Sequence, residues 1–225
     1  MKKLALLGTG KTGSQVMELA SEKGFEVSAF NSRNKATAAA LSSSDIVMSF
    51  LPGDAFLEYR EMILEAGKPL VCGSTGFEWS DKIKSELKTR KLSWLYATNF
   101  ALGMNIVHKM IEELAKARKL FDQYDFKMHE IHHTKKLDAP SGTALTWKKW
   151  LADQVEISSE RTGDVVGTHT LTLQSAFERI TLTHESLDRK IFAEGALWAA
   201  QKLLTDKTLI PGLHSFEDLT MKELL

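Results

Sequence analysis

A glycine-rich hexapeptide directly after the first apolar run restricts the folds that are open to this chain. Residues 3–7 form that apolar run, and Gly8, Gly10 and Gly13 follow it at the spacing GxGxxG. Residues 13–23 then carry apolar side chains at helical spacing. Glycines at these positions permit a tight turn and close packing of a helix on a strand. The segment therefore predicts a strand, a turn and a helix, the opening unit of a parallel sheet.

The same alternation continues toward residue 97. Further short apolar runs lie at residues 26–30, 45–51, 69–72 and 92–97, and helix-like stretches lie between them at 35–42, 54–66 and 80–90. Such alternation is typical of an α/β fold, in which a doubly wound parallel sheet carries helices on both faces. We therefore predict a Rossmann-type domain in the first part of the chain.

A different pattern begins near residue 103. We expect an amphipathic helix over residues 103–119, a strand over 124–133, a helix over 141–155, antiparallel strands over 165–173 and 177–184, and a helix over 193–204. The regular alternation has stopped, which predicts a second, central α+β unit. We expect the tail after Pro211-Gly212 to pack back onto the first domain.

Composition and charge exclude several classes of protein. Of the 225 residues, 43% are hydrophobic and 26% charged, and Lys+Arg and Asp+Glu each number 29, so no bulk positive field recruits nucleic acid or an anionic membrane. No apolar run is long enough to span a membrane or to serve as a signal peptide. The single cysteine, Cys72, cannot form an internal disulfide. We therefore expect a cytoplasmic protein in which Cys72 is a buried apolar side chain rather than a nucleophile.

The glycine loop predicts a dinucleotide site, because a helix N-terminus offers free N–H groups and a positive dipole end to a pyrophosphate. An NAD-specific site has an acidic residue after its second strand, but Asn31, Ser32 and Arg33 follow residues 26–30 here. Ser32 and Arg33 could hold a 2′-phosphate, so we predict a preference for NADPH over NADH. Two alternatives stay open: a glycine turn without a ligand, and an Arg33 that is only a surface cation.

A second candidate site lies at residues 130–144, where two histidines and two lysines precede Pro-Ser-Gly-Thr. Ser141 is suited to cap a helix, and the N–H groups of Gly142 and Thr143 in its first turn would face an anion such as a carboxylate. Lys136, a few residues upstream, could add a second cationic contact or donate a proton.

Two adjacent histidines, His132 and His133, point to opposite faces of a regular strand, so we expect different roles for them. One of them could deliver a proton near neutral pH. A metal-binding pair, or a satisfied and partly buried pair, is the alternative. We predict no metal site, because we find no third ligand near the pair in the sequence and Cys72 is far away.

The string Glu-Ile-His-His-x-x-Lys-x-Asp-Ala-Pro-Ser-Gly-Thr-Ala over residues 130–144 resembles the signature of the 4-hydroxy-tetrahydrodipicolinate reductase (dihydrodipicolinate reductase) family. The resemblance covers most of the chain. Residues 73–76 are similar to the family's cofactor loop, residues 99–100 to its hinge, and residues 161–170 and 184–196 to two further segments. Our chain departs from the family's first glycine loop, since Leu7 stands at one of its glycines and Thr12 in place of its methionine.

The resemblance implies a dinucleotide-binding domain over residues 1–101 and 190–225, and a substrate-binding and oligomerisation domain over 102–189 that builds a homotetramer. It implies reduction of a cyclic dicarboxylate, 4-hydroxy-tetrahydrodipicolinate, by NAD(P)H in lysine and diaminopimelate biosynthesis, and closure of the two domains. His132 is then the general acid/base and Lys136 the proton donor. The implied substrate contacts are His133, Gly142 and Thr143.

The glycine loop and the resemblance together indicate the residues that bind the cofactor. They are Gly8, Thr9, Gly10, Lys11, Thr12, Gly13, Ser32, Arg33, Gly73, Ser74, Thr75, Ala97, Thr98, Asn99 and Phe100.

Several alternatives stay open. Arg189 is either an ordinary ion-pair residue or lies near the cofactor, and we expect Trp147 and Trp150 to pack in the core or at a subunit contact rather than to stack on a base. A neighbouring Rossmann dehydrogenase, acting on a semialdehyde or on homoserine, would not account for the His-His and Pro-Ser-Gly-Thr segment. In a non-catalytic dinucleotide sensor, His132 and Lys136 could change without loss of function.

Overall fold

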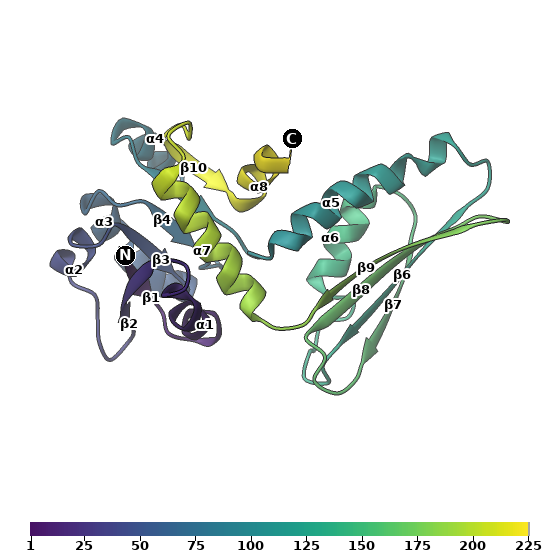
Figure 1. The fold of residues 1–225 in the computed structure, drawn as a ribbon, viewed down its shortest axis with the longest axis horizontal. Helices are drawn as coiled ribbons and strands as arrows, with labels where there is room; N and C mark the ends of the chain where they lie inside the picture. Colours follow the sequence, from purple (N-terminus) through teal and green to yellow (C-terminus); the bar gives the residue numbers. More distant parts are fainter. Residues whose placement is uncertain (225) are drawn as a thin grey trace. The chain divides into compact units, whose positions relative to one another are not determined.

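The computed structural model describes residues 1–224 of the chain, which form two compact units (Figure 1). The first unit comprises Met1–Leu102 and the segment from Lys190 onward, and the second comprises Gly103–Arg189. Within the described residues, no helix is both long enough and apolar enough to cross a membrane.

A parallel sheet forms the centre of the first unit. Its strands are β1 (Lys2–Leu7), β2 (Phe25–Phe30), β3 (Ile46–Ser49), β4 (Leu70–Cys72), β5 (Ser93–Tyr96) and β10 (Gly212–Ser215). They lie in the order β10-β5-β4-β3-β1-β2, and every pairing is parallel. Because β1 pairs with β2 on one side and with β3 on the other, the chain reverses its direction of winding there, and ligands bind at such a switch point. The predicted doubly wound α/β fold is confirmed.

Helices cover both faces of this sheet. They are α1 (Lys11–Ala20), α2 (Ala38–Ser42), α3 (Gly53–Glu65), α4 (Asp81–Thr89), α7 (Lys190–Thr205) and α8 (Phe216–Leu224). Leu4 and Leu6 of β1 pack in one apolar cluster with α1 and α7, whereas Ala5 and Leu7 pack in the other with α3 and α4. Because residues 4–7 of β1 are buried on both faces of the sheet, the sequence there is a continuous apolar run.

The tail returns to the first unit, where β10 pairs with β5 at the edge of the sheet. This return was expected from the sequence, but no strand was predicted at residues 212–215. Such a segment is too short and too polar to stand out as a strand, and its pairing with β5 depends on the tertiary structure.

A four-stranded sheet and two helices form the second unit. The strands are β6 (Asp125–His132), β7 (Glu156–Arg161), β8 (Gly167–Gln174) and β9 (Arg179–Ser186), in the order β7-β6-β8-β9 within the described residues. The helices are α5 (Leu102–Leu114), continued by a short 3-10 helix, η1 (Ala115–Lys119), and α6 (Gly142–Leu151). The antiparallel pairing of β8 with β9 is as predicted. The parallel edge strand β7 was missed, because an edge strand with a polar sequence lacks the apolar alternation that signals a strand.

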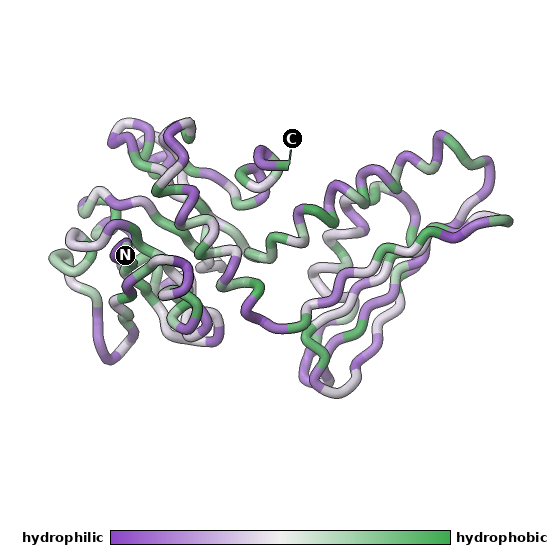
Figure 2. The backbone as a smooth tube through the Cα atoms, viewed as in Figure 1, coloured by the Kyte–Doolittle hydropathy of each residue, from purple (hydrophilic) through white to green (hydrophobic). Residues whose placement is uncertain are grey.

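One face of the second sheet is buried and the other is open. Figure 2 shows hydrophobic and hydrophilic residues interspersed along this sheet. In β8, His169, Leu171 and Leu173 are buried and the threonines between them are not. Trp147 of α6 is fully buried and its ring centre lies 5.5 Å from that of His169, so α6 covers the buried face. The prediction that Trp147 packs in the core is confirmed.

Helix α6 is shorter than predicted. It ends at Leu151 rather than at residue 155, because Ala152 adopts a left-handed conformation with φ of 51°.

Cys72 lies in the core at the end of β4. Burial raises the pKa of its thiol to about 12. A thiol that stays protonated is a poor nucleophile, so the prediction of an unreactive, buried side chain is confirmed.

Candidate active site

The residues predicted to bind the dinucleotide gather along the carboxyl edge of the first sheet. Residues 8–13 follow β1, residues 32–33 follow β2, residues 73–75 follow β4 and residues 97–100 follow β5. Strands that run parallel end at the same edge. The fold therefore brings four separated segments to the edge where α/β proteins bind ligands.

The three glycines of the first loop differ in what a Cβ atom would meet at their positions. Gly8 has φ of +99°, and a Cβ there would lie 2.9 Å from the backbone carbonyl of Phe50. A Cβ on Gly13 would lie 1.9 Å from the carbonyl oxygen of Gly8, so α1 could not pack against β1. Gly10, the N-cap of α1, is exposed, and a Cβ there would meet no atom of the described residues within 4 Å. Gly8 and Gly13 thus serve the fold, while Gly10 leaves an open helix N-terminus that suits a pyrophosphate.

The loop after β2 carries no carboxylate. Asn31 folds back on its own turn, where its Oδ1 accepts hydrogen bonds from the backbone N–H groups of Arg33 (2.9 Å) and Asn34 (3.1 Å). Its Nδ2 donates to Thr9 Oγ1 at 3.4 Å, which ties the turn to the glycine loop. Ser32 and Arg33 are exposed beside it. A hydroxyl and a guanidinium are therefore the groups that this turn presents to solvent.

Two predicted cofactor residues point inward. The Ser74 hydroxyl lies 2.9 Å from that of Ser49, and both are buried. The Phe100 ring packs edge-on against Phe50, with ring centres 5.9 Å apart, and tilted against Phe216 at 5.1 Å. These two side chains therefore support the loops, and their contact with a cofactor stays a prediction.

In the second unit, the predicted anion site forms the start of α6. Ser141 caps the helix, since its Oγ accepts a hydrogen bond from the N–H of Ala144 at 3.2 Å. An internal carboxylate already lies close by: Asp138 pairs with Lys136, with 2.8 Å between Oδ1 and Nζ. Hydrogen bonds from Lys136 and from the backbone of Gly142 lower the pKa of Asp138. The partner of Lys136 was not predicted.

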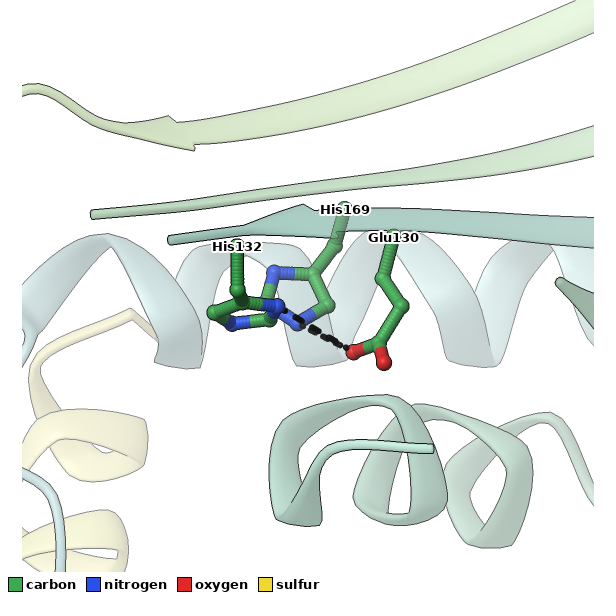
Figure 3. Close-up of side chains that lie close together, drawn as sticks. All are labelled: Glu130, His132 and His169. Atoms are coloured by element: carbon green, nitrogen blue, oxygen red, sulfur yellow. Dashed lines mark ion pairs between the residues drawn. The ribbon is translucent and has the colours of Figure 1, made fainter. Parts of the chain in front are cut away.

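A buried cluster of three ionisable side chains lies on the face of the second sheet that α6 covers (Figure 3). Glu130 and His132 are two residues apart on β6, and His169 on β8 stands directly opposite Glu130 in the strand register. The Oε2 atom of Glu130 lies 3.5 Å from His132 Nδ1 and 3.6 Å from His169 Nε2. All three side chains are at least nine-tenths buried.

The other oxygen of Glu130 is fully engaged. Its Oε1 accepts hydrogen bonds from the N–H of Ser141 (2.9 Å), the hydroxyl of Ser159 (2.8 Å) and Nη2 of Arg161 (3.0 Å). Burial raises the pKa of Glu130, but these hydrogen bonds outweigh burial and bring the pKa to about 2. The buried carboxylate is therefore ionised at neutral pH.

Both histidines of the cluster are neutral at neutral pH. Burial lowers the pKa of His169 to about 4, and the nearby His132 contributes to this lowering. The pKa of His132 is also lowered, first by burial and then by Lys136 and Arg161, although Glu130 acts in the opposite direction. A neutral histidine can accept a proton, and an ionised carboxylate beside it stabilises the charge that results, so His132 is suited to proton transfer.

The cluster also contains what a metal ion requires. Glu130, His132 and His169 each offer one ligand atom, and these atoms lie within 4.8 Å of one another. The prediction that no third ligand lies near the two histidines is therefore wrong, because His169 reaches the site through the pairing of β6 with β8. Arg161 already neutralises Glu130, which weakens the attraction of the site for a cation. The absence of a metal stays a prediction.

His133 lies beyond the end of β6 and has a different partner. Its Nε2 lies 3.3 Å from Nη2 of Arg189. Because a guanidinium only donates hydrogen bonds, this nitrogen of His133 accepts. The structure thus places Arg189 beside a predicted substrate residue. His132 and His133 have different surroundings, and their different roles stay a prediction.

Four residues of the site were missed or left without a role: Glu130, Ser159, Arg161 and His169. A signal for two of them was available. Glu130 shares the apolar face of its strand with Phe126 and Met128, and His169 shares that of β8 with Leu171 and Leu173. A polar side chain on a buried face needs a partner. Ser159 and Arg161 had no such signal, since they lie on the strand that was missed.

Comparisons with known proteins agree with this geometry. Family models described as "Dihydrodipicolinate reductase, N-terminus" and "Dihydrodipicolinate reductase, C-terminus" match residues 2–100 and 103–220. The 4-hydroxy-tetrahydrodipicolinate reductase of Magnetococcus marinus is 33% identical over 200 residues, which cover 78% of this chain and 73% of that protein. The protein of the same name from Thermosipho africanus is 36% identical over 176 residues, or 78% of each chain.

Solved structures show the same fold. A dipicolinate-bound dihydrodipicolinate reductase from Paenisporosarcina sp. TG-14 superposes with a TM-score of 0.74 at 20% identity, covering 97% of this chain and 99% of that one. A probable dehydrogenase from Thermotoga maritima has a TM-score of 0.61 at 11% identity, covering 97% and 92%. Since the two family models together span nearly the whole sequence, the resemblance of residues 130–144 is confirmed, and the chain belongs to the dihydrodipicolinate reductase family.

Proposed function

We propose that this protein catalyses the NAD(P)H-dependent reduction of 4-hydroxy-tetrahydrodipicolinate (dihydrodipicolinate) to tetrahydrodipicolinate. The observation that carries the proposal is the position of Ser141, which caps α6 and also donates its N–H to Glu130 beside His132. A single residue thus joins an anion-binding helix start to a histidine able to move a proton. Reduction of an unsaturated ring dicarboxylate requires both groups together. A role in lysine and diaminopimelate biosynthesis, in the cytoplasm, forms part of the same proposal.

The residues of the second unit have separate tasks in this proposal. The N–H groups of Gly142 and Thr143 bind one substrate carboxylate, and His133 contacts the substrate. His132 acts as general acid/base toward the ring, and Lys136 donates a proton and a positive charge. Asp138 keeps Lys136 at the helix start until the substrate carboxylate arrives.

Residues of the first unit hold the dinucleotide in this proposal. The open helix N-terminus after Gly10 binds the pyrophosphate, and residues 73–75 and 97–100 line the same edge of the sheet. Bound reduced nicotinamide would supply the hydride. Ser32 and Arg33 favour NADPH, because the turn that presents them has no carboxylate for a ribose hydroxyl.

The open face of the second sheet supports a homotetramer. Thr168, Thr170 and Thr172 of β8 are only partly buried there, and Thr181 and Thr183 of β9 are exposed. A wide sheet face rich in β-branched side chains suits contact with another sheet. The mass of the particle in solution, measured by light scattering, tests this part of the proposal.

The activity is tested by following oxidation of NADPH and of NADH, with substrate generated in the assay by a dihydrodipicolinate synthase. Turnover that depends on the synthase supports the proposal. A lower Michaelis constant for NADPH than for NADH supports the role of Ser32 and Arg33. Equal Michaelis constants for the two cofactors would remove the claim of preference. Tight dinucleotide binding without turnover would favour a sensing protein instead.

A further inference from the structure

The two oxygens of the Glu130 carboxylate have unequal surroundings. Oε1 accepts three hydrogen bonds, one of them from a guanidinium. Oε2 is buried and accepts none from the described residues, although it lies 3.5 Å from His132 Nδ1. An ionised oxygen buried without a donor is costly, so its nearest donor matters. Figure 3 shows the His132 and His169 rings as the groups that face it.

Of the two ring nitrogens nearest Oε2, His132 Nδ1 and His169 Nε2, only His132 Nδ1 lacks another partner among the described residues. His169 Nε2 already lies 3.1 Å from the Ser141 hydroxyl, whereas His132 Nδ1 is enclosed and has no other hydrogen-bond partner among the described residues. Hydrogen bonds of catalytic groups are often long before a substrate binds, so 3.5 Å is within reach of a bond that tightens on binding.

We infer that Glu130 is a positioning residue: its Oε2 accepts a hydrogen bond from the N–H at Nδ1 of His132, which keeps the ring proton on Nδ1 and leaves Nε2 as the atom that exchanges a proton with the substrate. This inference rests on the proposed function of His132. It assigns to Glu130 the task that a buried carboxylate performs beside a catalytic histidine, which is to select one tautomer and one ring orientation.

The surroundings of Nε2 fit this assignment. A Cβ on Gly167 would lie only 3.0 Å from His132 Nε2, so the glycine keeps a side chain away from that atom. Unlike Nδ1, Nε2 is not among the enclosed atoms that lack a partner. The ring therefore turns its enclosed nitrogen toward Glu130 and its accessible nitrogen toward Gly167.

Arg161 extends the network to the loop that carries Lys136. Its Nη2 donates to Glu130 Oε1 and also to the carbonyl oxygen of Asp138. Since Ser141 N–H donates to the same Oε1, one carboxylate holds the acid/base histidine, the helix start and the lysine loop in a common arrangement. A metal ion on Glu130, His132 and His169 would be an alternative occupant of the cluster, and added zinc tests for it.

The variant Glu130→Gln tests the inference sharply. The guanidinium of Arg161 and the N–H of Ser141 only donate, so they hold the amide oxygen, and the amide NH₂ then faces His132. Nδ1 must now accept, which moves the ring proton to Nε2. We expect kcat to fall on the order of 100-fold or more with dinucleotide affinity unchanged, because the wrong tautomer faces the substrate.

The matched control is Glu160→Gln. Glu160 on β7 lies 3.6 Å from His129 Nε2, but this pair is on the open face of the same sheet and is about half exposed. Glu160→Gln removes one carboxylate charge, as Glu130→Gln does, and it does so beside His129, which lies on β6 like His132. We expect no change in kcat or in its pH dependence.

The pH dependence of kcat separates positioning from mere structural support. The groups facing His132 are Glu130 and Asp138, which raise its pKa, Lys136 and Arg161, which lower it, and His169. Loss of the Glu130 charge removes a contribution that raises the pKa. The limb of the profile that reports His132 therefore moves to lower pH in Glu130→Gln, and stays in place in Glu160→Gln.

Nitrogen NMR of the histidine rings gives a readout that does not need turnover. The inference expects a proton on Nδ1 of His132 in the wild type and on Nε2 in Glu130→Gln. A proton on Nε2 in the wild type overturns it, even if the variant does not fold. Activity that appears only with added zinc also overturns it, in favour of the metal. If the tautomer changes as expected but the wild type does not reduce the substrate, the proposed function fails and the assignment of the tautomer stands.

Discussion

The glycine loop of the first unit and the Glu130 cluster of the second are built in opposite ways. The loop is a run of six consecutive residues, and glycine is required where a Cβ would strike backbone. The cluster consists of side chains from two strands, and its partners come from a third strand and a helix start, all brought together by strand register. A local motif can therefore be read from the sequence, whereas a site made by register becomes visible only when the pairing is known.

The strongest test of this comparison removes the acid/base group while leaving the loop intact. His132→Gln should lower kcat by about 10²- to 10⁴-fold, because a positioned acid/base contributes that much. NADPH affinity, measured by fluorescence titration, should not change, since the loop is made by the other unit. Lys136→Met should also lower kcat. Retained turnover in both variants would contradict the assignment of the proton-transfer groups.

The next test separates two glycines of the loop. Gly13→Ala places a Cβ 1.9 Å from a carbonyl oxygen and should lower the free energy of unfolding by about 3 kcal/mol. Gly10→Ala meets no atom of the described residues and should change stability by less than about 0.5 kcal/mol, yet weaken NADPH binding because the new methyl group occupies the approach to the helix start. Urea denaturation and cofactor titration measure the two effects. Equal destabilisation by both substitutions would contradict the separate roles given to the two glycines.

A third test uses the pH dependence of stability, which we expect from the ionisable groups of the cluster and not from the glycine loop. The pKa of His169 is lowered to about 4, so the unfolded chain binds a proton more readily, and stability is lost as pH falls from about 6.5 to 4. This loss amounts to roughly 3 kcal/mol for the second unit. Below that range, protonation of Glu130 lowers the free energy of unfolding further, because the pKa of Glu130 is also lowered in the folded chain. Urea midpoints between pH 4 and 7 should show the slope, and His169→Gln should flatten it.

Cofactor choice is a smaller effect within the loop region. Arg33→Ala should weaken NADPH binding by about tenfold and leave NADH binding unchanged, because only the 2′-phosphate needs the guanidinium. Arg60→Ala, which removes a surface arginine paired with the adjacent Glu61, is the control. A parallel loss of affinity for both cofactors would mean that Arg33 supports the turn rather than the phosphate.

The smallest expected effect is that of a chelator on the cluster. Dialysis against EDTA should leave turnover unchanged, since Arg161 neutralises Glu130 and Ser141 engages His169. A loss of activity that zinc restores would show that the three ligand atoms hold a metal.

Much of the fold follows from local patterns. The apolar run of β1, the glycine spacing and the helical periodicity of α1 each depend on neighbours within a few residues, and they predicted the Rossmann half correctly. Strands β7 and β10 could not be predicted in this way, because their sequences are short or polar and their pairing partners β6 and β5 are distant in the chain.

For the site, the amino-acid sequence alone reveals which reactive groups are available: the signature at residues 130–144 contains the histidines, the lysine and the helix cap. Which of these groups are coupled depends on the folded chain. The pairing of β6 with β8 sets His169 opposite Glu130, and the pairing with β7 sets Arg161 opposite His132. The physical reason is that burial and hydrogen bonding, which set the charge of Glu130 and the protonation of both histidines, depend on what the folded chain places around them.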